Sequence, residues 1–313
     1  MIFGKQFVKI NKVMRKLKIG LALGGGGVRG IAHLGVLKIL EREKIMPDFI
    51  AGTSMGSIVG AMYCCGISID EIEKKLIDFI GTDIYKNLKF ESMPQVESKN
   101  FFKNILNKVK QKVYFYLSGV KMAFLEKSAV DSLITYFLPD IDFKDLKIPF
   151  ASVSVDILQG KEIIMREGSI REAVASSISI PGIMPPAKFE EHILVDGGVV
   201  QMVPVKVLRD MGCDFSIGVN VSANLSPVTE SELKNAFNIE KRASNIAISH
   251  LIQIQLKDVD FLLEPSVKDI KWFEFKRFRE CILAGENETE GKIRRLKSKI
   301  RSKKFLTFIK RIF

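Results

Sequence analysis

Residues 47–63, PDFIAGTSMGSIVGAMY, are the stretch that decides the fold. Residues 47–51 form a short extended run, and residues 57–63 form a helical run. Between them stands Gly52-Thr53-Ser54-Met55-Gly56, a G-x-S-x-G sequence at the predicted strand-to-helix turn. A serine at such a turn projects its hydroxyl from the end of the sheet, beside the positive end of the next helix. Ser54 is therefore predicted to be a nucleophile.

The two glycines of this pentapeptide have a steric role. Gly52 and Gly56 lie two residues before and two residues after Ser54, where β-carbons would collide as the strand and the helix cross. The same pattern also occurs at ordinary helix N-termini, where serine is a common capping residue without a catalytic role. The other motifs of the chain distinguish a catalytic serine from a helix-capping serine.

A glycine-rich loop follows the first predicted strand. Residues 18–23 (KIGLAL) are an apolar strand, residues 24–30 (GGGGVRG) are the loop, and a helix follows to about residue 43. Together with the strand at 49–51, they make a β-α-β unit and predict a parallel sheet. The loop matches G-x-G-x-x-G, which is typical of dinucleotide sites, and its alternative role is an oxyanion hole of converging amides.

The nucleotide hypothesis is the weaker of the two. A dinucleotide site needs an acidic residue at the end of the second strand, and that strand ends in Gly52-Thr53-Ser54. A P-loop is excluded because no Gly-Lys-Ser/Thr follows the glycines. An oxyanion hole beside Ser54 is favoured.

The base that activates Ser54 is predicted to be an aspartate. The chain has three histidines, but His33 and His250 lie in helical stretches, and His192 is roughly 13 Å from Asp196 along one extended run. A Ser-His-Asp triad is therefore not well supported. Asp196 ends a predicted strand (residues 192–196) and precedes two glycines that permit a tight turn. The alternative is an ordinary Asp-Gly turn.

Taken in order, these motifs resemble those of the patatin-like phospholipase family, and in particular its compact bacterial members related to the catalytic domain of neuropathy target esterase. The resemblance covers about residues 18–290. It rests on the glycine loop, the serine pentapeptide, the Asp-Gly-Gly turn and a Ser- and Pro-containing segment, namely Gly25-Gly26-Gly27-Val28-Arg29-Gly30, Gly52-Thr53-Ser54-Met55-Gly56, Asp196-Gly197-Gly198 and Ala175-Ser176-Ser177…Pro181…Pro185-Pro186.

The resemblance implies a three-layer α/β/α sandwich with a mostly parallel central sheet. It also implies Ser54 as the nucleophile and Asp196 as the base of a two-member dyad that acts through an acyl-serine. The backbone of Gly25, Gly26 and Gly27 is then the oxyanion hole, with Arg29, Gly30, Gly52, Gly56, Gly197 and Gly198 as supporting motif positions. The implied activity is hydrolysis of carboxylic esters in phospholipids or lysophospholipids, without a metal or other cofactor.

Charge divides the chain into a body and two basic ends. The net charge is +12, yet residues 1–18 and 292–313 contain no acidic residue, and they carry all of the excess positive charge. Both ends also have large apolar residues at helical spacing, which favours the surface of an anionic membrane over nucleic acid as the partner. We therefore expect a basic amphipathic segment at 1–17, a hydrolase domain at 18–290 and a basic amphipathic helix at 291–313.

The remaining features bear on access and location. Residues 84–125 are irregular, with clusters of aromatic residues and lysines, and are expected to be a lid or cap or, alternatively, extra core helices.

No run in the sequence approaches the roughly 20 apolar residues that span a bilayer. The four cysteines form no C-x-x-C pair, so the expected location is the cytoplasm, with peripheral attachment to a membrane. A lipid-binding protein with a latent or minor esterase activity is the alternative function.

Overall fold

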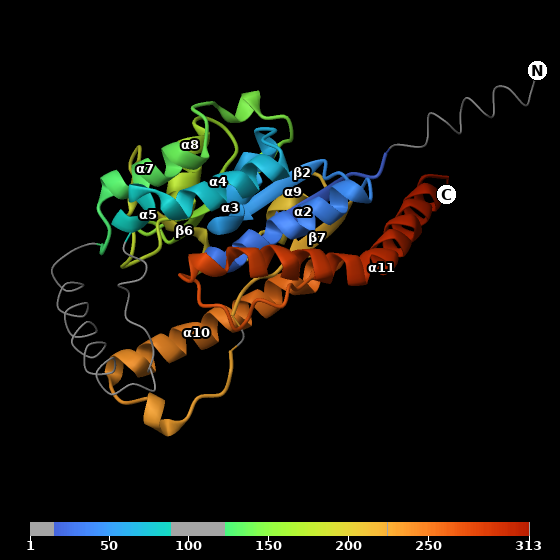
Figure 1. The fold of residues 1–313 in the computed structure, drawn as a ribbon. Coiled ribbons are helices and arrows are strands. Elements are labelled where there is room, and N and C mark those ends of the chain that lie inside the picture. The colour runs from blue at the N-terminus through green and yellow to red at the C-terminus, as the bar shows by residue number, and fades with distance from the viewer. Residues whose placement is uncertain (1–15, 89–122, 224, 313) are drawn as a thin grey trace, which may run out of the picture.

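The computed structural model describes residues 16–88, 123–223 and 225–312 (Figure 1). Residues 1–15 of the predicted N-terminal segment, and residues 89–122 of the predicted lid at 84–125, lie outside these ranges. The part of that region that is described includes a short helix, α5 (Asp83–Asn87), which follows α4 (Ile69–Gly81). Helix α4 begins with a capping box, in which the side chains of Ser68 and Glu71 each bind the backbone amide of the other residue.

An eight-stranded mixed sheet forms the centre of the protein, in the order β5-β6-β3-β2-β1-β7-β8 with β4 also paired to β3. Strands β3, β2, β1, β7 and β8 are parallel, and β4 and β6 run antiparallel to β3. The strands are β1 (Ile19–Leu23), β2 (Phe49–Thr53), β3 (Phe150–Asp156), β4 (Lys161–Met165), β5 (Ala187–Phe189), β6 (His192–Asp196), β7 (Phe215–Val219) and β8 (Phe261–Leu263). Strands β1, β2 and β6 lie where the sequence predicts them, and the short edge strand β5 follows two prolines.

Helices cover both faces of this sheet, which confirms the three-layer α/β/α sandwich. One face is covered by α2, α3, α8 and α11, and the other by α9. The principal helices are α2 (Ala32–Arg42), α3 (Met55–Cys64), α7 (Lys127–Phe137), α8 (Ile170–Ser177), α9 (Val205–Asp210), α10 (Ala236–Gln255) and α11 (Phe278–Ile312). Successive side chains along a strand point to opposite faces of the sheet. Ala22 and Ala51 therefore pack against Val205 of α9, while Leu21 and Leu23 point into the larger core on the other face.

Two strands meet end to end along one edge of β3. Ser152 and Ser154 both pair with β4, so β4 occupies one edge of β3. At the other edge Ser152 pairs with Gly52 of β2, and Ser154 pairs with Asp196 of β6. Because β2 is parallel and β6 antiparallel to β3, the carboxyl ends of β2 and β6 point toward each other. This register brings the residue after β2, Ser54, to the end of β6.

The C-terminal helix extends across the predicted boundary at residues 290 and 291. Helix α11 is continuous from Phe278 to Ile312, and its residues Leu296 and Ile300 are buried in the core. It crosses α2 at close range, because a β-carbon on Gly285 would lie 2.0 Å from the carbonyl oxygen of Ala32. The first part of the basic helix is therefore part of the folded body of the protein.

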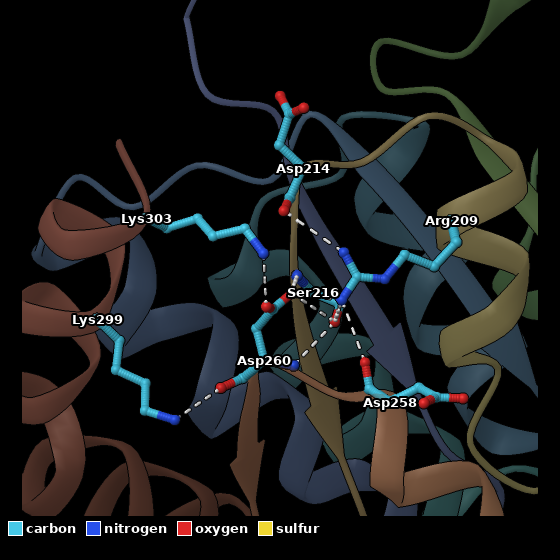
Figure 2. Close-up of polar contacts among 7 residues, drawn as sticks. All are labelled: Arg209, Asp214, Ser216, Asp258, Asp260, Lys299 and Lys303. Carbon is cyan, nitrogen blue, oxygen red and sulfur yellow. Dashed lines mark hydrogen bonds and ion pairs between the residues drawn. The ribbon is translucent and has the colours of Figure 1, made fainter. Parts of the chain in front are cut away.

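Asp260 fastens the later part of α11 to the amino ends of β7 and β8 (Figure 2). Its carboxylate accepts hydrogen bonds from Arg209 at 2.5 Å and from the backbone N–H of Ser216 at 2.9 Å. Lys303 of α11 forms an ion pair with the same carboxylate at 3.0 Å, and Lys299 donates to the Asp260 carbonyl oxygen at 3.2 Å. Because Ser54 follows the carboxyl end of β2, the end of α11 lies at the opposite end of the sheet from this serine.

Two further expectations concern membranes and disulfides. In the ranges that the structure describes, no helix combines the length and the apolarity that crossing a membrane requires. Cys64, Cys65, Cys213 and Cys281 are all free thiols.

Candidate active site

Ser54 occupies the sharp turn that the sequence predicts. It lies between β2 and α3 with φ 54° and ψ −123°, a conformation that costs a non-glycine residue roughly 1–3 kcal/mol. The steric prediction for the flanking glycines is also confirmed. A β-carbon on Gly56 would lie 2.1 Å from the carbonyl oxygen of Leu23, and one on Gly52 would lie 2.5 Å from that of Gly56. Only glycine fits at these two positions.

Neighbouring hydroxyl groups hold this strained turn in place. The backbone N–H of Ser54 donates to the hydroxyl of Ser177 at 3.0 Å, and the hydroxyl of Thr53 donates to the carbonyl oxygen of Gln201 at 2.9 Å. All four residues are buried. Ser177 lies in the Ser- and Pro-containing segment that carries the family resemblance, and its contact gives that segment a structural role.

The structure brings Asp196 and Ser54 together. Asp196 is 6% exposed and lies beside the Ser54 side chain, while the backbone N–H of Gly198 donates to its Oδ1 at 2.7 Å. Burial raises the pKa of Asp196 to about 6, although the interactions with Ser54 and Gly198 oppose the shift. Gly197 allows the turn to pack tightly, since a β-carbon there would lie 2.4 Å from the carbonyl oxygen of Val153.

The glycine loop lies beside the serine, and its amides are not equivalent. The N–H of Gly25 donates to the carbonyl oxygen of Met202 at 3.0 Å, and the N–H of Val28 donates to that of Trp272 at 2.8 Å. Among the residues that the structure describes, no acceptor pairs with the N–H groups of Gly26 and Gly27. These two amides are therefore the ones available to a bound group, and Gly25 helps to hold the loop.

The side chain of Arg29 orients the glycine loop. Arg29 Nε donates to the carbonyl oxygen of Gly26 at 3.2 Å. Because the C=O and N–H of a trans peptide point in opposite directions, this bond sets the direction of the Gly27 N–H. Gly30, next along the loop, leaves room for Met55, whose Cβ would lie 2.6 Å from a β-carbon on that glycine.

His33 is a structural residue. Its Nε2 lies 2.8 Å from the carbonyl oxygen of Gly24, so Nε2 carries the proton and donates. The ring is fully buried, and burial lowers its pKa to about 4 against the effect of the Gly24 bond. A neutral ring with its only proton engaged does not act as the base for Ser54.

An apolar pocket is lined by Ser54 and by side chains of α3, α4 and α7. Its empty volume, including the opening to solvent, is about 670 Å³. Trp272 and Phe275, which precede α11, close one side of it. The lining residues are otherwise almost all apolar, and they include Met55, Ile58, Val59, Met62, Ile72, Leu76, Phe79, Leu133, Phe137, Ile178, Ile180 and Met184.

The remaining candidate ligands lie elsewhere. His192 Nδ1 binds the buried carboxylate of Asp156 at 2.8 Å, and the ring stands at the opposite end of β6 from Asp196. Glu190, Glu191 and His192 are the one group of possible metal ligands found in the described ranges, and both glutamates are exposed. This cluster takes no part in the Ser54 site.

Sequence patterns gave no sign of the contact between α10 and the site. Gln255, the last residue of α10, donates from Nε2 to the carbonyl oxygen of Val200 at 2.5 Å, and its Oε1 accepts from the N–H of Val203 at 3.4 Å. The loop between these two residues also supplies the carbonyl groups that bind Thr53 and Gly25. Because the partners lie more than fifty residues apart, no local pattern could have indicated the contact.

Comparison with known proteins identifies a family for this chain. The family model "Patatin-like phospholipase" matches residues 21–209. An uncharacterized NTE family protein from Mycobacterium tuberculosis is 31% identical over 85% of this chain and 45% of its own length. Human patatin-like phospholipase domain-containing protein 6 is 29% identical over 69% of this chain and 14% of its own length. Lysophospholipase NTE1 from Saccharomyces cerevisiae is 28% identical over 89% of this chain and 17% of its own length.

The chain spans less than half the length of each of these relatives. Among solved structures, VipD from Legionella pneumophila aligns with 91% of this chain and 67% of its own, at 13% identity and a TM-score of 0.44.

Proposed function

The chain belongs to the patatin-like phospholipase family, and on this premise we propose that it is a serine lipid acyl hydrolase. Its proposed substrates are phospholipids or lysophospholipids, cleaved at a carboxylic ester. The observation that carries the proposal is the position of the buried Asp196 beside Ser54, which lines an apolar pocket. Two amides without a partner in the described structure, those of Gly26 and Gly27, lie in the neighbouring loop.

The first half of the proposed reaction forms an acyl-serine. Asp196 accepts the proton of the Ser54 hydroxyl while Oγ attacks the ester carbonyl carbon. The negative charge that develops on the carbonyl oxygen is stabilised by the amides of Gly26 and Gly27 and by the amino end of α3. When the tetrahedral intermediate collapses, the bond to the leaving oxygen breaks, and the proton passes from Asp196 to the departing alcohol.

The second half restores the enzyme. Asp196 takes a proton from a water molecule, the water oxygen attacks the acyl carbon, and the bond to Ser54 Oγ breaks. The proton returns to Oγ, and a fatty acid leaves. A base works best when its pKa lies near the working pH, so the raised pKa of Asp196, about 6, suits this role better than that of an exposed aspartate.

The pocket supports a long-chain acyl group as the substrate part that is bound. Its walls are apolar from Ser54 to the aromatic side chains of Phe79 and Phe137. An acyl chain placed there leaves its polar head group at the opening, where the ester meets Ser54. Burial of apolar surface contributes about 0.8 kcal/mol per CH₂ group, which favours long chains over short ones.

The proposal also covers the arrangement of the chain and its attachment to membranes. Residues 18–290 form the hydrolase domain, and α11 continues this domain as far as the buried Ile300. The basic ends assist peripheral binding to anionic lipid. At the end of α11, Phe305 and Leu306 are exposed next to Lys304. Lys297 and Lys303 contribute less to lipid binding because they are paired with Glu43 and Asp260.

The proposal is tested by comparing single-substitution variants for labelling by a serine-reactive probe and for lipid hydrolysis. Ser54→Ala is expected to abolish both labelling by a fluorophosphonate probe and release of fatty acid from a lipid panel. Ser132→Ala, an exposed serine of α7, serves as the matched control and is expected to keep both. Full activity of the Ser54→Ala protein refutes the proposal. Vesicle binding without any probe labelling of the unmodified protein supports the alternative, a lipid-binding protein with a latent site.

A further inference from the structure

Helix α10 exposes apolar side chains over most of its length. Ile239, Ile246, Leu251 and Ile254 are 55%, 38%, 40% and 59% exposed. From residue 243 to residue 256 the sequence contains no Asp, Glu, Lys or Arg. A solvated helix normally covers its outer face with charged residues, so this composition suits contact with an apolar medium better than contact with water.

The charged residues of α10 stand at its ends. Lys241 and Arg242 lie in the first turns, with Glu240 beside them, and Lys257 follows the last turn with Asp258 next to it. A helix that combines exposed apolar side chains, uncharged polar residues and cationic residues near its ends suits the head-group region of an anionic lipid surface. The charge distribution therefore favours lipid as the occupant of this face.

The base of α10 is attached to the candidate active site. Gln255 binds the loop at Val200 and Val203, and this loop follows the Asp196 turn along the chain. Figure 1 shows α10 extending away from the sheet, while the C-terminal end of α11 lies on the other side of the molecule. The exposed face of α10 thus begins close to the residues that are proposed to perform the chemistry.

The basic end of α11 is directed elsewhere. Asp260 holds Lys299 and Lys303 at the amino ends of the strands (Figure 2), and Ser54 lies at a carboxyl end. A membrane bound only at this end of α11 contacts the end of the sheet opposite Ser54. A second contact surface is needed to place the ester at Ser54.

We propose that α10 is the surface that docks the enzyme onto an anionic lipid bilayer with the mouth of the pocket facing the lipid. The inference rests on the proposed lipid hydrolase function and assigns its orientation on the substrate surface. Ile239, Ile246 and Leu251 enter the head-group region, while the flanking cations meet the lipid phosphates. A soluble short-chain ester reaches Ser54 without this contact, so docking and chemistry can be measured separately.

The experiment uses the full chain with the substitutions Ile239→Gln, Ile246→Gln and Leu251→Gln combined. Binding is measured by sedimentation with vesicles of phosphatidylcholine and phosphatidylglycerol, in the Ser54→Ala background, so that it does not depend on catalysis. We expect the partition coefficient to fall at least about tenfold. The matched control, Phe305→Gln with Leu306→Gln on α11, removes exposed apolar groups at the other end and is expected to have a smaller effect.

With Ser54 intact, the α10 variant is expected to lose about tenfold in hydrolysis of vesicle lipid and to keep its rate on a soluble short-chain ester. The inference is overturned if the α10 variant binds and hydrolyses vesicles like the unmodified protein, or if the α11 control carries the loss. Failure of the proposed function appears differently, as absence of Ser54-dependent hydrolysis while vesicle binding still depends on α10.

A measurement on the unmodified α10 guards against misfolding of the variant. Hydrogen exchange of the Ser54→Ala protein is compared with and without the same vesicles. Amides of residues 239–254 are expected to become slower to exchange when vesicles are added, and less so with vesicles of phosphatidylcholine alone. Unchanged exchange over this helix, with protection confined to the end of α11, contradicts the proposal.

Discussion

Replacing Asp196 by asparagine is expected to abolish ester hydrolysis and, at neutral pH, to stabilise the folded protein. Burial raises the pKa of this carboxyl group from 3.8 to about 6, so the folded state favours the neutral form. A shift of about two pKa units corresponds to roughly 3 kcal/mol. The ionised carboxylate therefore costs the native protein about this much free energy of unfolding at pH 7.5, and asparagine removes that cost.

The pH dependence gives the prediction its sign. Because the folded pKa is raised, the neutral carboxyl costs nothing below about pH 4, and stability is lost as the pH rises through about 6. The Asp196→Asn protein lacks this loss. Its advantage over the unmodified protein should be near zero at pH 4 and should reach its full value above pH 7.

Urea unfolding at several pH values between 4 and 8 measures this difference, with Asp131→Asn on the exposed face of α7 as the control for removing a negative charge. A stabilisation that is the same at every pH, or a variant that is less stable at pH 7.5, would refute the argument that Asp196 is strained by burial. Such strain is common at catalytic groups, where stability and activity make opposite demands.

The remaining predictions concern the rate, the loop and α11. The value of kcat/KM for a soluble ester should fall about tenfold per pH unit below about pH 6, since protonated Asp196 cannot accept the proton of the serine. Arg29→Met should lower kcat about 10²-fold with little change in KM, because it releases the amide of the oxyanion hole, and single-turnover kinetics measures this step. Gly285→Ala should destabilise the protein by at least about 3 kcal/mol in urea unfolding, whereas Gly291→Ala on the same helix, with no atom near its β-carbon, should stabilise it by about 0.5–1 kcal/mol. Asp260→Asn should speed hydrogen exchange of residues 299–309, because it removes the ion pair that holds the end of α11, and exchange at residues 282–292 serves as the internal control.

Local patterns were sufficient for most elements of the fold. Strand β1, the glycine loop and helix α2 were predicted from hydrophobic periodicity and from the run of glycines between them. The turn at Ser54 was predicted with its glycines, because the steric conflict between a strand and the following helix involves residues only a few positions apart. In such cases the interacting atoms are neighbours along the chain, so their residue types appear together in the sequence.

Other parts of the fold escaped these patterns. Strand β5 is three residues long and follows two prolines, so it offers too little alternation to be recognised. Helix α11 begins at Phe278, well before the basic stretch from which a helix at 291–313 was predicted. Its first turns pack on α2 and have the apolar pattern of a core helix, so they were assigned to the domain and not to this helix. The predicted membrane helix is therefore partly a structural element of the body.

The sequence by itself determined the strand-turn-helix around Ser54, the glycine loop and the Asp-Gly-Gly turn, since each depends on contacts within a few residues. Only the tertiary structure decided that β2 and β6 meet end to end along β3 and thereby join Ser54 to Asp196. It also decided that Gly25 is engaged by Met202, and that Gln255 ties α10 to the site. The physical reason is that these partners are separated by many tens of residues, so their contact depends on sheet register and helix packing, which no local pattern encodes.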